Sequence, residues 1–177
     1  VKSPNPDEAR GLSMLKRADD LKPGMHFNEP TGTVHAVGPG LVAFEVSEQT
    51  QVTYRLYDYN RGRALHLEEG CKAVMTPRPD WTVLDPGISI EAASIETLTQ
   101  FPTFCVLKAA GESLTIRSAK HRHLVTATMG DVRISGPSAE WDITLKHSFT
   151  SLVPPVAQPY AIETMGSGEV LITSLKD

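Results

Sequence analysis

The chain has 177 residues, enough for one or two domains of ordinary size, and 40% of them are hydrophobic. Its formal net charge of −4 and its pI near 5.9 provide no basic field for nucleic acid or for an anionic membrane. The sequence has no apolar run of membrane-spanning length and does not start with a signal-peptide pattern. We therefore expect a cytoplasmic globular protein with no nucleic-acid or membrane partner.

The first twenty residues are polar and predict a single surface helix. This helix would cover Pro6–Asp19, with Asp7 and Glu8 in its first turn and Lys16 and Arg17 near its end. Acidic residues at the start of a helix and basic residues at its end match the direction of the helix dipole.

The next segments predict a β-meander. Three short runs are rich in β-branched and aromatic residues, namely Val34–Val37, Leu41–Val46 and Val52–Tyr57. Turns separate the first two from their neighbours, because proline and glycine occur at Pro30 to Gly32 and again at Gly38 to Gly40. Each run is short enough to be one strand of a small sheet or barrel.

Each predicted strand carries one residue whose side chain could take part in catalysis or binding. In chain order these are His35, Glu45 and Arg55. All three can point into one barrel mouth, although the period of two does not prove that they share a face. Without its flanking motif, His35 is interpreted as a core histidine hydrogen-bonded to a backbone carbonyl group. Burying Glu45 is costly unless it is paired, so it either pairs with Arg55 or acts with Arg55 on a substrate. Arg63 is expected to face solvent.

A domain boundary is predicted at residues 76–87, where TPRPDWTVLDPG contains three prolines and a glycine. We place one β-module at residues 1–80 and a second at residues 81–177. Seven short strands are expected in the second module: Thr103–Ala109, Gly111–Ser118, Leu124–Met129, Val132–Ser135, Trp141–Leu145, Phe149–Val153 and Glu169–Ser174. The run Glu91–Thr99 is interpreted as a short helix or a turn.

Two further sets of residues have plain structural interpretations. Cys71 and Cys105 are expected to be free, strand-buried thiols, because the chain has no secretory signal. His121 and His123 would lie on the same side of a strand, as metal ligands can. Two neighbouring cations and the lack of a nearby carboxylate favour a solvated strand end over a metal site.

Two long motifs give a specific resemblance. PTGTVHAVGPGLVAFE (Pro30–Glu45) and TYRLYDYNRGRALHLE (Thr53–Glu68) resemble the corresponding runs of class I mannose-6-phosphate isomerases. The ending AIETMGSGEVLITSL is similar, more weakly, to the C-terminal domain of the same enzymes. The resemblance implies an all-β, cupin-like jelly-roll fold with two tandem β-modules and a short N-terminal helix.

The same resemblance implies roles for three residues. His35 would be a zinc ligand, Glu45 an active-site carboxylate that also contacts substrate, and Arg55 the arginine that handles the sugar phosphate. The implied reaction is the interconversion of mannose 6-phosphate and fructose 6-phosphate through an enediol. Glu29 departs from the family pattern, in which a hydrophobic residue usually precedes the proline.

The remaining zinc ligands of the family, a Gln, a His and a Glu, have no counterpart in Val1–Leu21. One histidine cannot hold a catalytic zinc ion, which needs about three protein ligands. We expect one zinc ion held mostly by residues outside this chain, and a chain that is inactive alone. Three explanations stay open: a C-terminal fragment whose partner is the missing N-terminal part, a subunit completed by another polypeptide, or a non-catalytic cupin that binds sugar or is structural.

Overall fold

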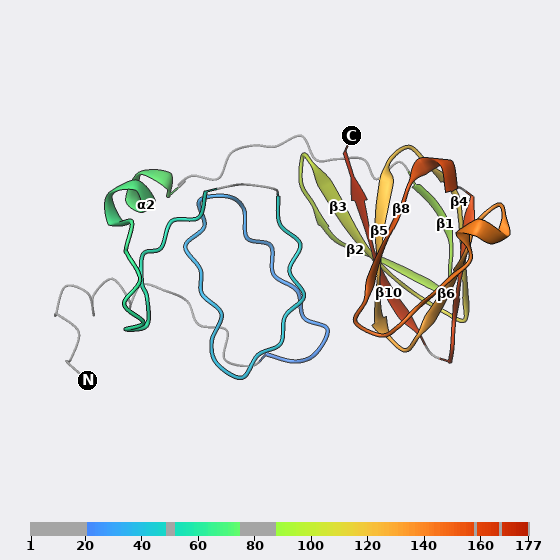
Figure 1. The fold of residues 1–177 in the computed structure, drawn as a ribbon, viewed down its shortest axis with the longest axis horizontal. Helices are drawn as coiled ribbons and strands as arrows, with labels where there is room; N and C mark the ends of the chain where they lie inside the picture. The colour runs from blue at the N-terminus through green and yellow to red at the C-terminus, as the bar shows by residue number, and fades with distance from the viewer. Residues whose placement is uncertain (1–20, 49–51, 75–87, 158, 167, 177) are drawn as a thin grey trace.

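The computed structural model describes residues 21–48, 52–74, 88–157, 159–166 and 168–176. Residues 88–176 form a sandwich of two antiparallel sheets, and residues 21–74 lie beside it (Figure 1). A hydrogen bond from Thr103 Oγ1 to Glu48 Oε1, 2.5 Å long, connects the two parts. No helix within the described residues is long and apolar enough to cross a membrane. The predicted helix Pro6–Asp19 falls outside the described residues.

Each sheet of the sandwich has five strands. The first sheet contains, in spatial order, β1 (Ile88–Glu91), β4 (Ser113–Ala119), β9 (Tyr160–Thr164), β6 (Val132–Ser135) and β7 (Ile143–Leu145). The second contains β2 (Ser94–Gln100), β3 (Phe104–Ala110), β10 (Glu169–Leu175), β5 (Arg122–Met129) and β8 (Thr150–Val153). Two 3₁₀ turns, η1 (Ala139–Trp141) and η2 (Pro155–Ala157), lie next to β7 and β8 in the chain.

The central strand β10 shows why these segments form a sandwich. Val170, Ile172 and Ser174 on one face of the strand are fully buried, and Thr173 on the other face is buried as well. Ile172 lies opposite Leu107 of β3 and Val125 of β5. These three side chains form one apolar row on the inner face of the second sheet, and such cross-strand rows are the unit that stabilises a sheet.

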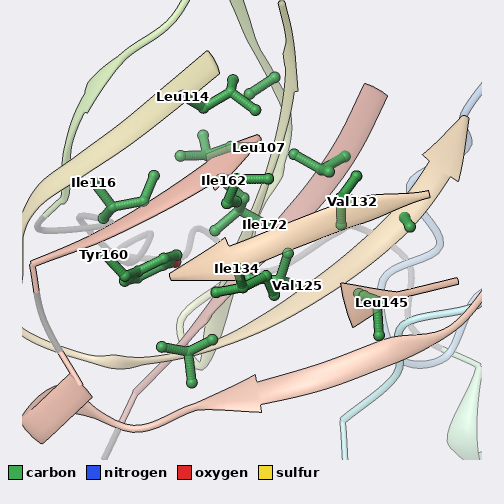
Figure 2. Packing of buried hydrophobic residues seen from close by; sticks show 14 of the residues in the cluster. Leu107, Leu114, Ile116, Val125, Val132, Ile134, Leu145, Tyr160, Ile162 and Ile172 are labelled. Carbon is green, nitrogen blue, oxygen red and sulfur yellow. The ribbon is translucent and has the colours of Figure 1, made fainter. Parts of the chain in front are cut away.

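The core between the sheets closes around this row (Figure 2). The facing sheet contributes four fully or almost fully buried aliphatic side chains, Leu114, Ile116, Ile134 and Ile162. Strands β6 and β9 alternate buried and less buried residues, the pattern of a sheet with one face on a core, whereas β3 of the second sheet is buried along most of its length. Most of the strands predicted between residues 103 and 174 are therefore present as parts of this two-sheet sandwich.

Three details of that module differ from the sequence-based expectation. Residues Glu91–Thr99 form the end of β1 and most of β2, not a helix or turn. Strand β9 was not predicted as a separate strand, because Pro154, Pro155 and Pro159 obscure its start. Of the two free cysteines, Cys105 is buried in β3 as expected, whereas Cys71 is exposed.

The part of the chain before the sandwich differs more from the sequence-based prediction. Residues 21–48 and 52–74 contain no assigned strand, so the meander predicted over Val34–Val37, Leu41–Val46 and Val52–Tyr57 is not formed. A strand needs a neighbour to bond its N–H and C=O groups, and these segments have none within the described residues. Their apolar side chains face solvent, with Val42 fully exposed. The division at residue 80 stays a prediction.

One helix of this region was not predicted. It is α2 (Leu67–Ala73), with Glu68 in its first turn and Lys72 in its last. Lys72 Nζ lies 2.6 Å from Glu68 Oε1, one helical turn away, which is a stabilising spacing. Gly70 is buried, and a Cβ atom there would lie 2.5 Å from Leu56 Cδ2. The glycine therefore lets the helix pack directly on Leu56.

Candidate active site

His35 lies on an exposed loop that begins with a tight turn. The Thr33 N–H donates to the Pro30 carbonyl at 2.9 Å, and Gly32 between them has φ +83°. A positive φ at the third residue of a turn is the reason that glycine is needed there. Beyond the turn, the His35 Nδ1 atom lies 3.0 Å from the Thr33 carbonyl oxygen. Because a carbonyl only accepts, Nδ1 carries the hydrogen.

The other ring nitrogen of His35 faces a carboxylate. His35 Nε2 lies 3.2 Å from Glu29 Oε2, and about half of each side chain is exposed. His35 is therefore not a core histidine. The sequence analysis noted Glu29 only as a departure from the family pattern, and the turn at Pro30–Thr33 is what brings it back to His35.

Glu45 is exposed, and no ion pair joins it to Arg55 among the residues that the structure describes. The structural pair that the sequence analysis considered is thus not formed. Within the described residues the Glu45 carboxylate is exposed, which leaves it accessible to a ligand or to another polypeptide.

Arg55 is held by its own loop. Its Nη1 donates to the Ala64 carbonyl at 3.0 Å, and its Nε lies 3.7 Å from Asp58 Oδ1. The Arg55 N–H also donates to His66 Nδ1 at 3.0 Å. The backbone and side chain of Arg55 are both fixed, so the guanidinium is positioned before any ligand arrives. Preorganised charges of this kind bind anions at low entropic cost.

Asp58 is the residue that organises this loop, and the sequence analysis did not single it out. Its carboxylate is buried and accepts two hydrogen bonds from Arg63, from the backbone N–H at 2.7 Å and from Nε at 2.5 Å. Burial opposes ionisation, but these hydrogen bonds and the charges of Arg63 and Arg55 outweigh it and lower the pKa of Asp58. Arg63, expected to face solvent, is therefore half-exposed and ion-paired. The sequence does hold one sign of this cluster, because Asp58 lies three residues after Arg55 and five residues before Arg63.

The donor set of this region fits part of a zinc site. His35 offers a nitrogen and Glu29 an oxygen, both ligand types that zinc accepts. Among the described residues, no group of three or more His, Cys, Asp or Glu side chains is arranged to hold a metal ion. Two donors are fewer than a catalytic zinc ion needs, so the remainder would have to come from elsewhere.

The second module buries a different polar pair. His123 is fully buried in β5, and its Nδ1 lies 2.7 Å from the hydroxyl of Tyr160 in β9. Burial and the nearby His121 lower the pKa of His123 from 6.5 to about 4, and burial raises that of Tyr160. Both side chains are neutral at pH 7. The expectation that His123 marks a solvated strand end is therefore wrong.

The chain was compared with known proteins. No family model matches it. It is 30% identical over 168 residues to the mannose-6-phosphate isomerase ManA of Bacillus subtilis, covering 91% of this chain and 52% of that protein. It is 29% identical over 122 residues to the mannose-6-phosphate isomerase of Streptococcus mutans, covering 65% of this chain and 38% of that protein.

This chain is a relative of the mannose-6-phosphate isomerases. The resemblance found in the two sequence motifs is confirmed. The chain spans about half the length of the curated relatives that it matches.

The structure comparison concerns the fold alone. The crystal structure of the mannose 6-phosphate isomerase from Bacillus subtilis superposes with a TM-score of 0.51 at 19% identity, over 69% of this chain and 40% of that chain. A cupin superfamily protein from Desulfitobacterium hafniense gives a TM-score of 0.41 at 18% identity, over 49% of this chain and 82% of that one. Together with the two antiparallel sheets, the Bacillus structure confirms the all-β, cupin-like jelly-roll class.

Proposed function

We propose that this chain is part of a zinc-dependent isomerase that interconverts mannose 6-phosphate and fructose 6-phosphate through an enediol. The observation that carries the proposal is the alignment with the Bacillus isomerase over 168 residues, 91% of the chain. The fixed Arg55 and the exposed His35 and Glu45 are compatible with it. Because sugar phosphates are charged and do not cross membranes unaided, we place this activity in the cytoplasm.

Arg55 would bind the sugar phosphate or the negative charge that develops on the enediolate. A guanidinium is permanently charged and presents several N–H groups to phosphate oxygens. In the described residues its only hydrogen bond goes from Nη1 to Ala64, so donors on Nη2 remain for a ligand. Asp58 and Ala64 would hold the group in place while it binds.

Glu45 would act as an acid–base group in moving a proton between C1 and C2 of the sugar. Such a group must come within hydrogen-bond reach of the proton that it transfers. An exposed carboxylate without a fixed partner can approach a substrate without first breaking an ion pair. Glu45 would also contact the substrate hydroxyl groups.

His35 would bind the zinc ion through Nε2, since the Thr33 carbonyl holds the hydrogen on Nδ1. Zinc, when bound, supplies a Lewis acid that stabilises negative charge developing on a sugar oxygen. The other ligands would come from the missing N-terminal part of the enzyme, which would be the protein partner of this chain. One zinc ion would be held mostly by residues outside this chain.

The experiment that tests this proposal is a chimera. The part of the Bacillus isomerase that lies outside the alignment is joined to this chain, and the conversion of mannose 6-phosphate is measured with added zinc. We expect isomerase activity that neither piece has alone. A chimera that folds and retains zinc but converts no mannose 6-phosphate would refute the proposal. The intact Bacillus protein serves as the positive control.

A second candidate is a non-catalytic cupin domain that binds sugar or is purely structural. The specific observation in its favour is that the described residues hold no group of three metal donors. The chimera separates the two candidates, because a non-catalytic domain would give a folded chimera without turnover, even when zinc is bound.

A further inference from the structure

Arg63 contacts Asp58 through only one of its guanidinium nitrogens, among the residues that the structure describes. Its Nε donates to Asp58 Oδ1 at 2.5 Å, whereas the second carboxylate oxygen, Oδ2, accepts the backbone N–H of Arg63 at 2.7 Å. The backbone therefore takes the place that a second guanidinium nitrogen has in the usual forked pair of arginine and carboxylate. Within these residues, Nη1 and Nη2 of Arg63 keep their hydrogens for another acceptor, and about half of the side chain is exposed.

Arg133 shows the contrast within the same chain. Its Nε donates to Asp142 Oδ1 at 2.8 Å and its Nη2 donates to Asp142 Oδ2, so the guanidinium itself binds both carboxylate oxygens. The two arginine side chains are almost equally exposed, 49% for Arg133 and 47% for Arg63. Arg133 therefore has the geometry that ion pairing alone favours, and Arg63 does not.

Arg55 lies against the same carboxylate oxygen as Arg63. Its Nε is 3.7 Å from Asp58 Oδ1, so the two guanidinium groups are neighbours across one buried carboxylate. A phosphate group has several oxygens and can accept hydrogen bonds from two guanidinium groups at once, because each presents its N–H donors in a plane. Asp58 therefore holds two arginines close enough together to bind one phosphate group.

The charge of this part of the chain also favours an anion. Residues 52–66 contain three arginines and one aspartate, a net charge of +2 with His66 neutral, in a chain whose net charge is −4. One carboxylate offsets only part of the repulsion between Arg55 and Arg63. An anion bound to both guanidinium groups would be attracted by two positive charges at short range.

We propose that Arg63 is a second phosphate-binding residue of this chain, so that Arg55 and Arg63 together bind the phosphate group of a sugar phosphate. Asp58 would be the positioning residue that holds the two guanidinium groups side by side. The inference rests on the proposed function, from which it takes the phosphate role of Arg55. It places the phosphate end of the substrate at this pair of arginines.

The test uses the full chain and the Nε–Hε signals of arginine in ¹⁵N NMR spectra. Inorganic phosphate, mannose 6-phosphate and mannose are added separately at constant ionic strength. The signals of Arg55 and Arg63 are identified by their absence in Arg55→Lys and Arg63→Lys. We expect both phosphate compounds to shift the two signals, and mannose to leave them unchanged.

The variants then measure what Arg63 contributes. Arg63→Ala should weaken the binding of inorganic phosphate and of mannose 6-phosphate about tenfold or more, because hydrogen bonds from a charged group are lost. Arg63→Lys keeps the charge and should lose less. Arg133→Ala is the matched control, since it removes an equally exposed arginine that is paired with an aspartate, and it should leave phosphate binding unchanged.

The inference is overturned by any of three results. If phosphate shifts Arg55 alone and Arg63→Ala binds it as tightly as the natural chain, Arg63 serves only to hold Asp58. If inorganic phosphate shifts both signals and mannose 6-phosphate shifts neither, the site does not accept a sugar phosphate. If neither compound shifts them, or if the Arg63 signal lies where that of a free arginine does, the paired site does not exist. The isomerase proposal is tested separately, by the turnover of the chimera.

Discussion

At the residue scale, the candidate site depends on three side chains with different predicted roles. In the active chimera, His35→Ala should deplete zinc, and added zinc should partly restore turnover, because one ligand among several lowers affinity about 10–100-fold without abolishing coordination.

Glu45→Gln should keep zinc and substrate binding but slow turnover about 10²–10⁴-fold if the carboxylate transfers the proton. Arg55→Ala should raise the Michaelis constant or lower turnover.

Metal analysis and steady-state kinetics check these three variants, and denaturation gives the control. The fold should survive each substitution. If Glu45→Gln and Arg55→Ala each reduced stability equally, and the double variant were no worse, the two would form a structural ion pair. The described residues contain no such pair, since the carboxylate beside Arg55 belongs to Asp58.

The buried His123 gives a prediction about pH. Its pKa is lowered from 6.5 to about 4, so the unfolded chain binds a proton that the folded chain does not bind between these values. Stability should therefore fall as the pH drops from about 6.5 to about 4. The slope is about 1.4 kcal/mol per pH unit for one such group, with a total loss of up to about 3 kcal/mol.

Urea unfolding at several pH values between 7 and 4 measures this loss. His123→Gln removes the titration while keeping a polar group near the Tyr160 hydroxyl, so it should flatten the pH dependence. His26→Gln, at an exposed histidine, is the control and should leave the slope unchanged. An equal slope in the natural chain and in His123→Gln would contradict the prediction.

At the element scale, the sandwich strands differ sharply in what their side chains contribute. Leu114 in β4 is fully buried between the sheets, whereas Leu152 in β8 is 57% exposed. Leu114→Ala should lower the free energy of unfolding by about 2–5 kcal/mol, because it removes buried methyl groups and leaves a cavity. Leu152→Ala makes the same chemical change and should cost under about 1 kcal/mol.

Urea denaturation of these two variants provides the measurement. Similar losses in both would mean that the core does not lie between the two sheets as described. Residues 34–48 and 52–57 represent the opposite case, since they form no strand and their apolar residues lack partner strands within the described residues. Their side chains can be buried only when another segment pairs with them.

At the scale of the whole molecule, residues 21–74 expose many large apolar side chains, including Phe27, Val42 and Phe44. Contiguous exposed apolar surface commonly marks an interface. This observation agrees with a chain that covers 52% of the Bacillus isomerase. We therefore expect this polypeptide alone to bind zinc weakly and to show no measurable isomerase activity.

Metal analysis after dialysis against a mild chelator, combined with an isomerase assay, checks this expectation. Two donors provide only part of the coordination energy that retains a zinc ion. Stoichiometric zinc retained by the chain alone, or turnover by it, would show that the site is complete without a partner. The chimera provides the reference for zinc retained by a full ligand set.

The sequence by itself determined the all-β class, most strands of the second module and the resemblance to the isomerases. These follow from side-chain alternation and from long motifs, which are local properties of the chain. Only the tertiary structure decided that His123 is buried against Tyr160, that Asp58 holds Arg55 and that Glu29 lies beside His35. Such contacts depend on strand register, on turn geometry and on which segments find partners, and no periodicity in the sequence encodes them.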